Sequence, residues 1–293
     1  MRLGAAMLQG GLHGIKSCLS CFEWNLTKRG TETIMTTSAV GSLAQRLGKG
    51  TPLITAWTGI PDPLLVGILA REDFDAVVLD MQHGANDINT IIPSIAQVAL
   101  AGKPAIVRIP VGQFETASRA LDLGAAGIIA PMINNAADAR QLAAFTKFLP
   151  VGERSWGPTI TLNMTQQQQG DYLKEANKMH VTIAMVETRE ALAALDDILA
   201  VDGIDGVLVG PSDLSIALSN GGHVDQTHPD VFKALEHVLA RCRHHKKAAT
   251  VFTPNGQIGR KLANDGFDLL SIGTDIMQLR AGAKAAIEAY RKG

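Results

Sequence analysis

Short apolar stretches alternate along this chain with longer segments in which apolar residues recur every three to four positions. From Pro52 onward eight such stretches appear, and most are rich in β-branched residues. This alternation is typical of βαβ units that build a parallel sheet. The expected strands are residues 53–57, 75–80, 104–109, 126–131, 181–187, 204–210, 248–253 and 268–273.

Several of these strands have nearly unbroken apolar interiors, as expected when both faces of a strand are buried. Eight strands of this kind predict the α/β class and a closed (β/α)8 TIM barrel. The alternative is an open doubly wound sheet, but the glycine fingerprint that binds phosphate after its first strand is absent. Helices are expected between the strands, for example at residues 89–100, 136–148, 190–199, 229–245 and 256–264.

Two segments depart from this alternation. Residues 1–34 mix Gly, Ser, Cys and basic residues without periodicity, so we expect an N-terminal extension outside a barrel domain of residues 35–293. A targeting peptide is the rival interpretation, but Glu23, Glu32 and the lack of a long apolar core argue against a secretory signal. Residues 152–178 form the one long irregular connection, and its length suggests a lid or an oligomer contact.

Composition narrows the class of protein further. A length of 293 residues suits one α/β barrel, and 46% hydrophobic with 19% charged residues is ordinary for a soluble globular protein. The formal net charge of −1 gives no overall attraction to nucleic acid. No apolar run approaches the roughly 20 residues that cross a bilayer. Three cysteines do not make a disulfide framework, so we expect a reducing, cytoplasmic compartment.

Polar residues gather at the predicted C-terminal ends of the strands, where barrel enzymes place their reactive groups. Glu187 ends the fifth strand, and Asp213 follows the sixth. Carboxylates there suit a hard divalent cation such as Mg2+, which takes one or two of them together with water and substrate oxygens. Either acid alone could equally be a helix cap. The two together, with Arg108 and His83 predicted at the same face, favour a catalytic site.

Arg108 and His83 add fixed hydrogen-bond donors and a proton carrier to this predicted site. The Arg108 guanidinium suits a carboxylate or a developing enolate oxygen, and its alternative role is an ion pair with an acid of the barrel. His83 can move protons near neutrality, and its alternative is a loop histidine bonded to Asp80. No predicted strand carries a lysine in its interior or at its C-terminal end, so an enolate would be stabilised by a metal rather than through a Schiff base.

Five motifs occur in an order and at spacings that are much more specific than any one of them. They are VLDMQH at 78–83, IVR at 106–108, LDLGAAGIIAP at 121–131, VETREA at 186–191 and VGPSDLS at 209–215. Together they resemble the class II pyruvate aldolases of the HpcH/HpaI family, which includes 4-hydroxy-2-oxoheptanedioate aldolase and sugar-acid aldolases. The resemblance implies a (β/α)8 barrel and a homo-oligomer, a hexamer built as a trimer of dimers that exchange their last helix.

The resemblance also implies roles for individual residues. Glu187 and Asp213 match the metal ligands, with Mg2+, Mn2+ or Co2+ as the implied ion. His83 matches the general base, and Arg108 matches the residue that stabilises the enolate. Ser212 matches a position that contacts the substrate.

Asp122 matches the acid that raises the basicity of the histidine. Because Asp122 is predicted to follow a helix and precede the fourth strand, a neighbouring subunit would have to bring it to His83. Two positions depart from the family's heptanedioate aldolases, which carry a substrate-contacting glutamine where this chain has Met185 and a glutamate where it has Gln82. We expect the metal-dependent chemistry to be retained despite both differences, whereas these positions leave the polarity of the substrate open.

The expected reaction is reversible aldol cleavage of a 4-hydroxy-2-oxo acid to an aldehyde and pyruvate, or a related 2-oxo acid such as hydroxypyruvate. The first alternative is an acyl-CoA lyase of the citrate lyase or malyl-CoA lyase type, which would need a basic segment at the barrel mouth. The second is a non-catalytic barrel, which would be expected to have lost one of the four main site residues. All four are present.

Overall fold

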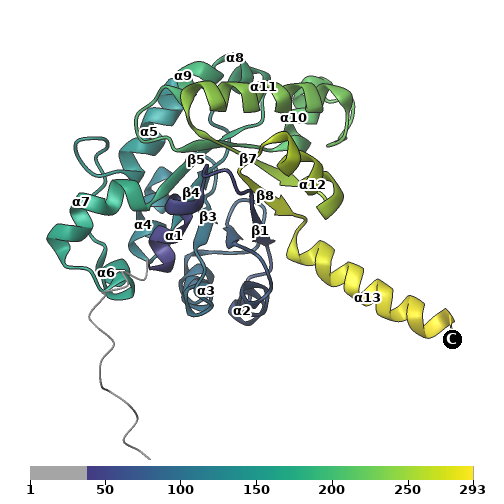
Figure 1. Cartoon of the computed structure of the whole chain (residues 1–293), viewed down its shortest axis with the longest axis horizontal. Coiled ribbons are helices and arrows are strands. Elements are labelled where there is room, and N and C mark those ends of the chain that lie inside the picture. The colour runs from purple at the N-terminus through teal and green to yellow at the C-terminus, as the bar shows by residue number, and fades with distance from the viewer. Residues whose placement is uncertain (1–37, 293) are drawn as a thin grey trace, which may run out of the picture. The chain divides into compact units, whose positions relative to one another are not determined.

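Eight parallel strands close into a barrel in the computed structural model, which describes residues 38–292 (Figure 1). Each strand pairs with the next along the chain, and β8 pairs with β1. The strands are β1 (Leu53–Thr58), β2 (Ala76–Asp80), β3 (Ala105–Arg108), β4 (Gly127–Ala130), β5 (Val181–Val186), β6 (Gly206–Val209), β7 (Ala248–Thr253) and β8 (Leu269–Ile272). The predicted (β/α)8 TIM barrel is confirmed, and no strand bound differs from its prediction by more than about two residues.

Helices surround the barrel and connect its strands. They are α1 (Ala39–Arg46), α2 (Pro63–Arg71), α3 (Ile88–Leu100), α4 (Phe114–Asp122), α5 (Ala136–Thr146), α6 (Thr159–Thr165), α7 (Gln169–Met179), α8 (Arg189–Ala193), α9 (Leu195–Leu199), α10 (Pro211–Leu218), α11 (Pro229–His245), α12 (Gly256–Asp265) and α13 (Asp275–Lys292). The single helix predicted at 190–199 is divided at Ala194 into α8 and α9.

The connection predicted to be irregular at 152–178 contains α6 and most of α7, so that prediction is wrong over these residues. The reason is the sparse burial of both helices. In α7 only Tyr172 and Ala176 are buried, and in α6 only Thr161, which leaves no apolar periodicity to read. The predicted extension at 1–34 lies outside the described residues.

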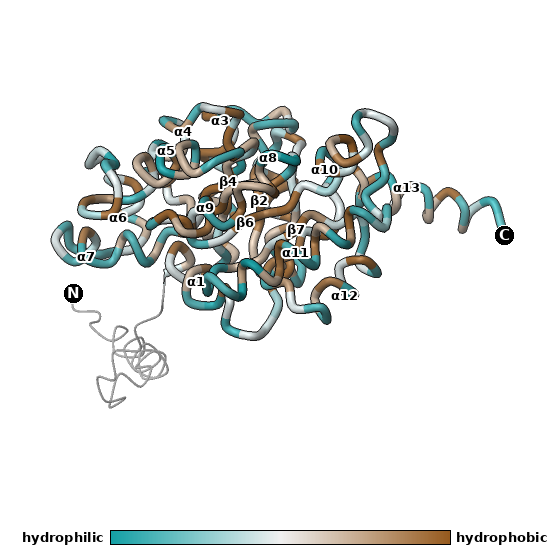
Figure 2. The backbone as a smooth tube through the Cα atoms, turned by 90° about the horizontal axis from the view of Figure 1, so that it is seen from above, coloured by the Kyte–Doolittle hydropathy of each residue, from teal (hydrophilic) through white to brown (hydrophobic). Residues whose placement is uncertain are grey.

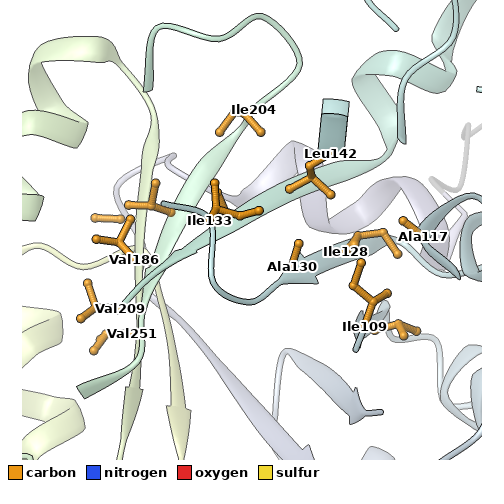
Figure 3. Packing of buried hydrophobic residues seen from close by; sticks show 14 of the residues in the cluster. Ile109, Ala117, Ile128, Ala130, Ile133, Leu142, Val186, Ile204, Val209 and Val251 are labelled. Atoms are coloured by element: carbon orange, nitrogen blue, oxygen red, sulfur yellow. The ribbon is translucent and has the colours of Figure 1, made fainter. Parts of the chain in front are cut away.

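Two apolar layers form because successive strand residues point to opposite faces of the sheet. One set, including Val78, Ile106 and Ile183, fills the barrel lumen, and Leu43 of α1 joins it. The other set packs against the helices, and Figure 3 shows part of it, including Ile128, Val186, Val209 and Val251 with Leu142 of α5. The strands at the centre of Figure 2 are accordingly among its most hydrophobic stretches, while the outer helices mix both colours.

Helix α13 differs from the others because it runs away from the barrel as a single helix (Figures 1 and 2). Its first residue, Asp275, is buried, whereas the turns that follow are mostly exposed. None of the helices in residues 38–292 is long and apolar enough to span a membrane.

Candidate active site

Strand alternation directs a group of polar and aromatic side chains to the C-terminal end of the lumen. Val78 and Ile106 face the lumen, so Asp80 and Arg108, two residues further along β2 and β3, face it too. In the same way Ile183 and Met185 lead to Glu187, which directly follows β5. The topology therefore brings these groups together without any contribution from long loops.

A cavity of about 490 Å³ opens at this end of the barrel. It brings together most of the residues predicted from the sequence, namely His83, Arg108, Met185, Ser212 and Asp213. Arg108 is the only Lys or Arg among its described lining residues, so no described lysine lines this cavity. The basic segment expected of an acyl-CoA lyase does not line this cavity either.

Arg108 and Asp80 form a buried, bidentate ion pair. Nε and Nη2 of Arg108 donate to Oδ1 and Oδ2 of Asp80 at 2.9 and 2.5 Å. The guanidinium carbon lies 4.8 Å from the ring centroid of Trp57, whose Nε1 donates to Asp80 Oδ2 at 3.2 Å. Burial raises the pKa of Asp80, but the hydrogen bonds and charge of Arg108 outweigh it and leave the pKa lowered. Arg108 thus forms an ion pair with an acid of the barrel, as the alternative interpretation expected, and it also lines the cavity.

His83 lies in the loop after β2, and its position is set by backbone contacts. Its N–H and that of Gln82 donate to Asp80 Oδ1 at 3.2 and 2.9 Å, so the bond to Asp80 uses the backbone of His83. The loop turns at Gly84 against the residue that follows β1, because a Cβ there would lie 2.8 Å from Gly59 Cα and 2.3 Å from the Asp80 carbonyl oxygen. Only glycine fits this approach, which holds the His83 loop at the cavity mouth.

Glu187 and Asp213 interact although they come from different strand ends. Glu187 is buried, and its Oε1 accepts a hydrogen bond from Met132 N at 2.9 Å. Burial raises the pKa of Glu187 and is the largest effect. The Met132 hydrogen bond lowers the pKa, the negative charge of Asp213 raises it and Arg108 lowers it, which leaves the pKa raised. Glu187 is not a helix cap, because Thr188 caps α8 through its Oγ1. Asp213 lies in the first turn of α10.

This pair suits a divalent cation. Two nearby carboxylates, one of them buried, carry negative charge that a hard cation would compensate with oxygen ligands. Among residues 38–292 no group of three or more His, Cys, Asp or Glu residues could hold a metal. A cation held by this pair would take two carboxylates from the protein and fill its remaining ligand positions with water and substrate oxygens.

Met185 and Ser212 flank this charged centre. The Met185 sulfur lies 4.0 Å from Arg108 Nη1 and presents an apolar surface where the family's heptanedioate aldolases have an amide. Ser212 Oγ accepts a hydrogen bond from Gln226 Nε2 at 2.7 Å, which leaves its own proton available to a ligand.

Asp122 does not join the cavity within one chain. It ends α4, on the side of the barrel where β4 begins, and its Oδ1 accepts a hydrogen bond from Arg154 Nη2 at 2.5 Å. The Arg154 side chain is fully buried, so this ion pair holds Asp122 firmly away from His83 of its own chain.

Sequence reasoning missed Asp275, the buried first residue of α13. Its Oδ2 accepts hydrogen bonds from Gly59 N and Ile60 N at 2.9 and 2.8 Å, and its Oδ1 accepts one from Ile276 N at 2.8 Å. Asp275 also lines the cavity. Its position just after the eighth strand could have indicated a place in the site. Its hydrogen bonds to Gly59 and Ile60 could not be foreseen, because those residues lie far from it in the sequence.

Known proteins resemble this chain over most of its length. A sequence profile of the HpcH/HpaI aldolase/citrate lyase family matches residues 54–281. The hydroxypyruvate/pyruvate aldolase of Rhizorhabdus wittichii is 38% identical over 82% of this chain and 94% of its own, and that of Roseovarius nubinhibens is 32% identical over 84% and 95%. The crystal structure of an HpcH/HpaI aldolase/citrate lyase family protein from Burkholderia cenocepacia superposes with a TM-score of 0.77 at 28% identity, covering 86% of this chain and 99% of that one.

These likenesses agree with the five sequence motifs and with the barrel, so the predicted family is confirmed. Both named relatives are aldolases, which make or break carbon–carbon bonds. The chain therefore belongs to the HpcH/HpaI aldolase/citrate lyase family and is a carbon–carbon lyase of the pyruvate aldolase class.

Proposed function

We propose that this chain cleaves 4-hydroxy-2-oxo acids reversibly to an aldehyde and either pyruvate or hydroxypyruvate, with Glu187 and Asp213 holding a divalent cation. The observation that carries the proposal is the charge of Asp213 acting on buried Glu187, close to the Arg108–Asp80 ion pair. Asp213 and Arg108 line a cavity that no described lysine lines. The names of the relatives from R. wittichii and R. nubinhibens support the two 2-oxo acids.

In the proposed mechanism, the bound cation would act as a Lewis acid toward the carboxylate and keto oxygens of the substrate. Arg108 holds charge that develops on the keto oxygen, and Asp80 keeps its guanidinium in one orientation. His83 removes the proton of the 4-hydroxyl group. The bond between C3 and C4 then breaks, C4 leaves as the aldehyde, and C3 keeps the electron pair as an enolate that takes up a proton to give the 2-oxo acid.

We further propose that the active form is a homo-oligomer in which α13 packs on a second copy and Asp122 of a neighbouring copy supports His83. The support comes from α13, which exposes Leu279, Ile287 and Tyr290 at helical spacing beyond the cavity. A helix whose apolar stripe stays exposed to the described residues of its own chain is stabilised chiefly by packing against another surface. The hexamer implied by the family resemblance is the proposed assembly.

The test of the metal-dependent reaction is to incubate the chain with pyruvate, an aldehyde and Mg2+, Mn2+ or Co2+, and then add a chelator. We expect product formation to stop and to return when excess metal is added. Glu187→Gln should lower kcat/KM by about two orders of magnitude or more, because one of the two protein ligands loses its charge. Glu190→Gln, on the exposed side of α8, is the matched control. Turnover that persists in the chelator would contradict the mechanism.

A further inference from the structure

The cavity has an uneven distribution of charge. Its described lining includes the carboxylates of Asp80, Asp213 and Asp275. Arg108 is the one Lys or Arg in that lining. The charge of Arg108 is already neutralised by Asp80 at 2.5 Å. When the carboxylate of a 2-oxo acid is bound, the described lining therefore has no unpaired Lys or Arg that could pair with a second carboxylate on the aldehyde.

One side of the cavity is apolar. We define the apolar wall as Trp57, Ile60, Phe252 and Ile276, which come from β1, the loop after it, β7 and the start of α13. Trp57 and Phe252 contact each other edge to face, with ring centroids 5.4 Å apart. This wall gives an aliphatic or aromatic chain a surface to pack on.

Asp275 connects the apolar wall to the rest of the site. Its carboxylate accepts hydrogen bonds from the backbone N–H groups of Ile60 and Ile276, so it sets the positions of two wall residues. It also places a buried carboxylate beside the wall, and the hydrogen bonds that it accepts from the described residues come from backbone N–H groups. A second carboxylate entering here would lose water and meet a like charge in a medium of low dielectric constant.

We infer that the aldehyde partner of this enzyme is uncharged and carries an apolar chain, and that Asp275 and the apolar wall select against aldehydes that carry a carboxylate. The inference rests on the proposed aldol reaction. In the synthetic direction, C3 of pyruvate loses a proton to the general base and bonds to the aldehyde carbon. The aldehyde oxygen takes up a proton and becomes the 4-hydroxyl group.

A matched pair of aldehydes tests the inference. Butanal and succinic semialdehyde each have four carbons and differ by a terminal methyl group against a carboxylate. With pyruvate and Mn2+, we expect kcat/KM for butanal to exceed that for succinic semialdehyde by about tenfold or more, from charge repulsion and lost packing. An equal or higher value for the semialdehyde would overturn the inference and leave the aldol reaction standing. No metal-dependent turnover of either aldehyde would instead remove the proposed function itself.

Substitutions in the apolar wall test whether this wall is responsible for the preference between the two aldehydes. Ile60→Lys puts a cation on the apolar wall and should move the ratio about tenfold toward succinic semialdehyde, whereas Ile68→Lys, on the exposed face of α2, should leave it unchanged. Ile276→Lys is a second test of the same kcat/KM ratio if Ile60→Lys does not fold. If soluble, folded variants at both positions keep the parent ratio, the wall does not contact the aldehyde chain and the inference is wrong.

Discussion

At the residue scale, the carboxylate of Glu187 has room only because residue 210 is glycine. A Cβ on Gly210 would lie 2.5 Å from Glu187 Oε2 and 3.1 Å from Met185 Cε. We expect Gly210→Ala to displace the Glu187 carboxylate and to weaken metal binding by about tenfold or more. The measurement is the rise in melting temperature on titration with Mn2+, because an ion that binds only the folded state stabilises it.

Gly170→Ala is the control for this substitution, since no atom lies within 4 Å of a Cβ at that position in α7. It should keep the full metal-dependent rise in melting temperature. A Gly210→Ala variant with unchanged metal affinity and kcat would show that Glu187 Oε2 has no part in holding the ion.

Much of the site could be predicted from residue order alone. His83, Arg108 and Asp213 share one cavity because a parallel barrel gathers all strand ends at one face. The contacts of Asp275 could not be predicted, since they depend on how β8 closes against β1. The role of Asp80 as the partner of both Arg108 and Trp57 depends in the same way on pairing between neighbouring strands.

At the scale of elements, the junction of α7 and β5 contains a buried histidine that must stay neutral. His180 Nδ1 donates to Ala125 O at 3.0 Å, so its Nε2 accepts the hydrogen bond from Tyr172 Oη at 2.7 Å. Burial lowers the pKa of His180 well below its ordinary value of 6.5, with added repulsion from Arg154 and Lys147. The unfolded chain therefore takes up this proton near pH 6.5 and the folded chain does so only at lower pH.

The stability contributed by neutral His180 is thus complete above about pH 6.5 and is lost as the pH falls below it. We expect the free energy of unfolding to drop by up to about 1.4 kcal/mol per pH unit from this residue alone. Urea titrations between pH 7.5 and 5.5 should show a flatter dependence for His180→Gln than for the parent chain. His237→Gln, at an exposed position of α11, should keep the parent slope. Equal slopes for all three proteins would contradict the assignment.

The same scale explains why the strands were easier to predict than some helices. Val207, Leu208 and Val209 are all buried because β6 has the lumen on one side and helices on the other, so its composition reveals it directly. Helix α7 covers the barrel with few apolar residues, and burying Tyr172 and Ala176 leaves too weak a pattern. A helix that buries only a narrow stripe can therefore be recognised from the structure but not from its sequence pattern.

At the scale of the whole molecule, α13 predicts how the chain assembles. Leu279 and Ile287 are 61% and 50% exposed on a helix that projects from the barrel (Figure 1). Changing both to glutamate should convert the proposed oligomer to smaller species in sedimentation velocity, because charges would replace the apolar contact. Leu173→Glu, at an exposed position of α7, is the control. A parent chain that sediments as a monomer at micromolar concentration would contradict the proposed assembly.

The first residue of α13 belongs to the cavity, while the rest of the helix projects outward. In the proposed assembly, Asp275 would therefore link the fit of the aldehyde to the association of subunits. In the proposed assembly, a force that a neighbouring copy exerts on α13 would be transmitted through the Asp275 carboxylate to the backbone of Ile60 and Ile276. If the proposed assembly forms, the affinity for the aldehyde would depend on it, and a dissociated subunit would hold its substrate against a looser wall.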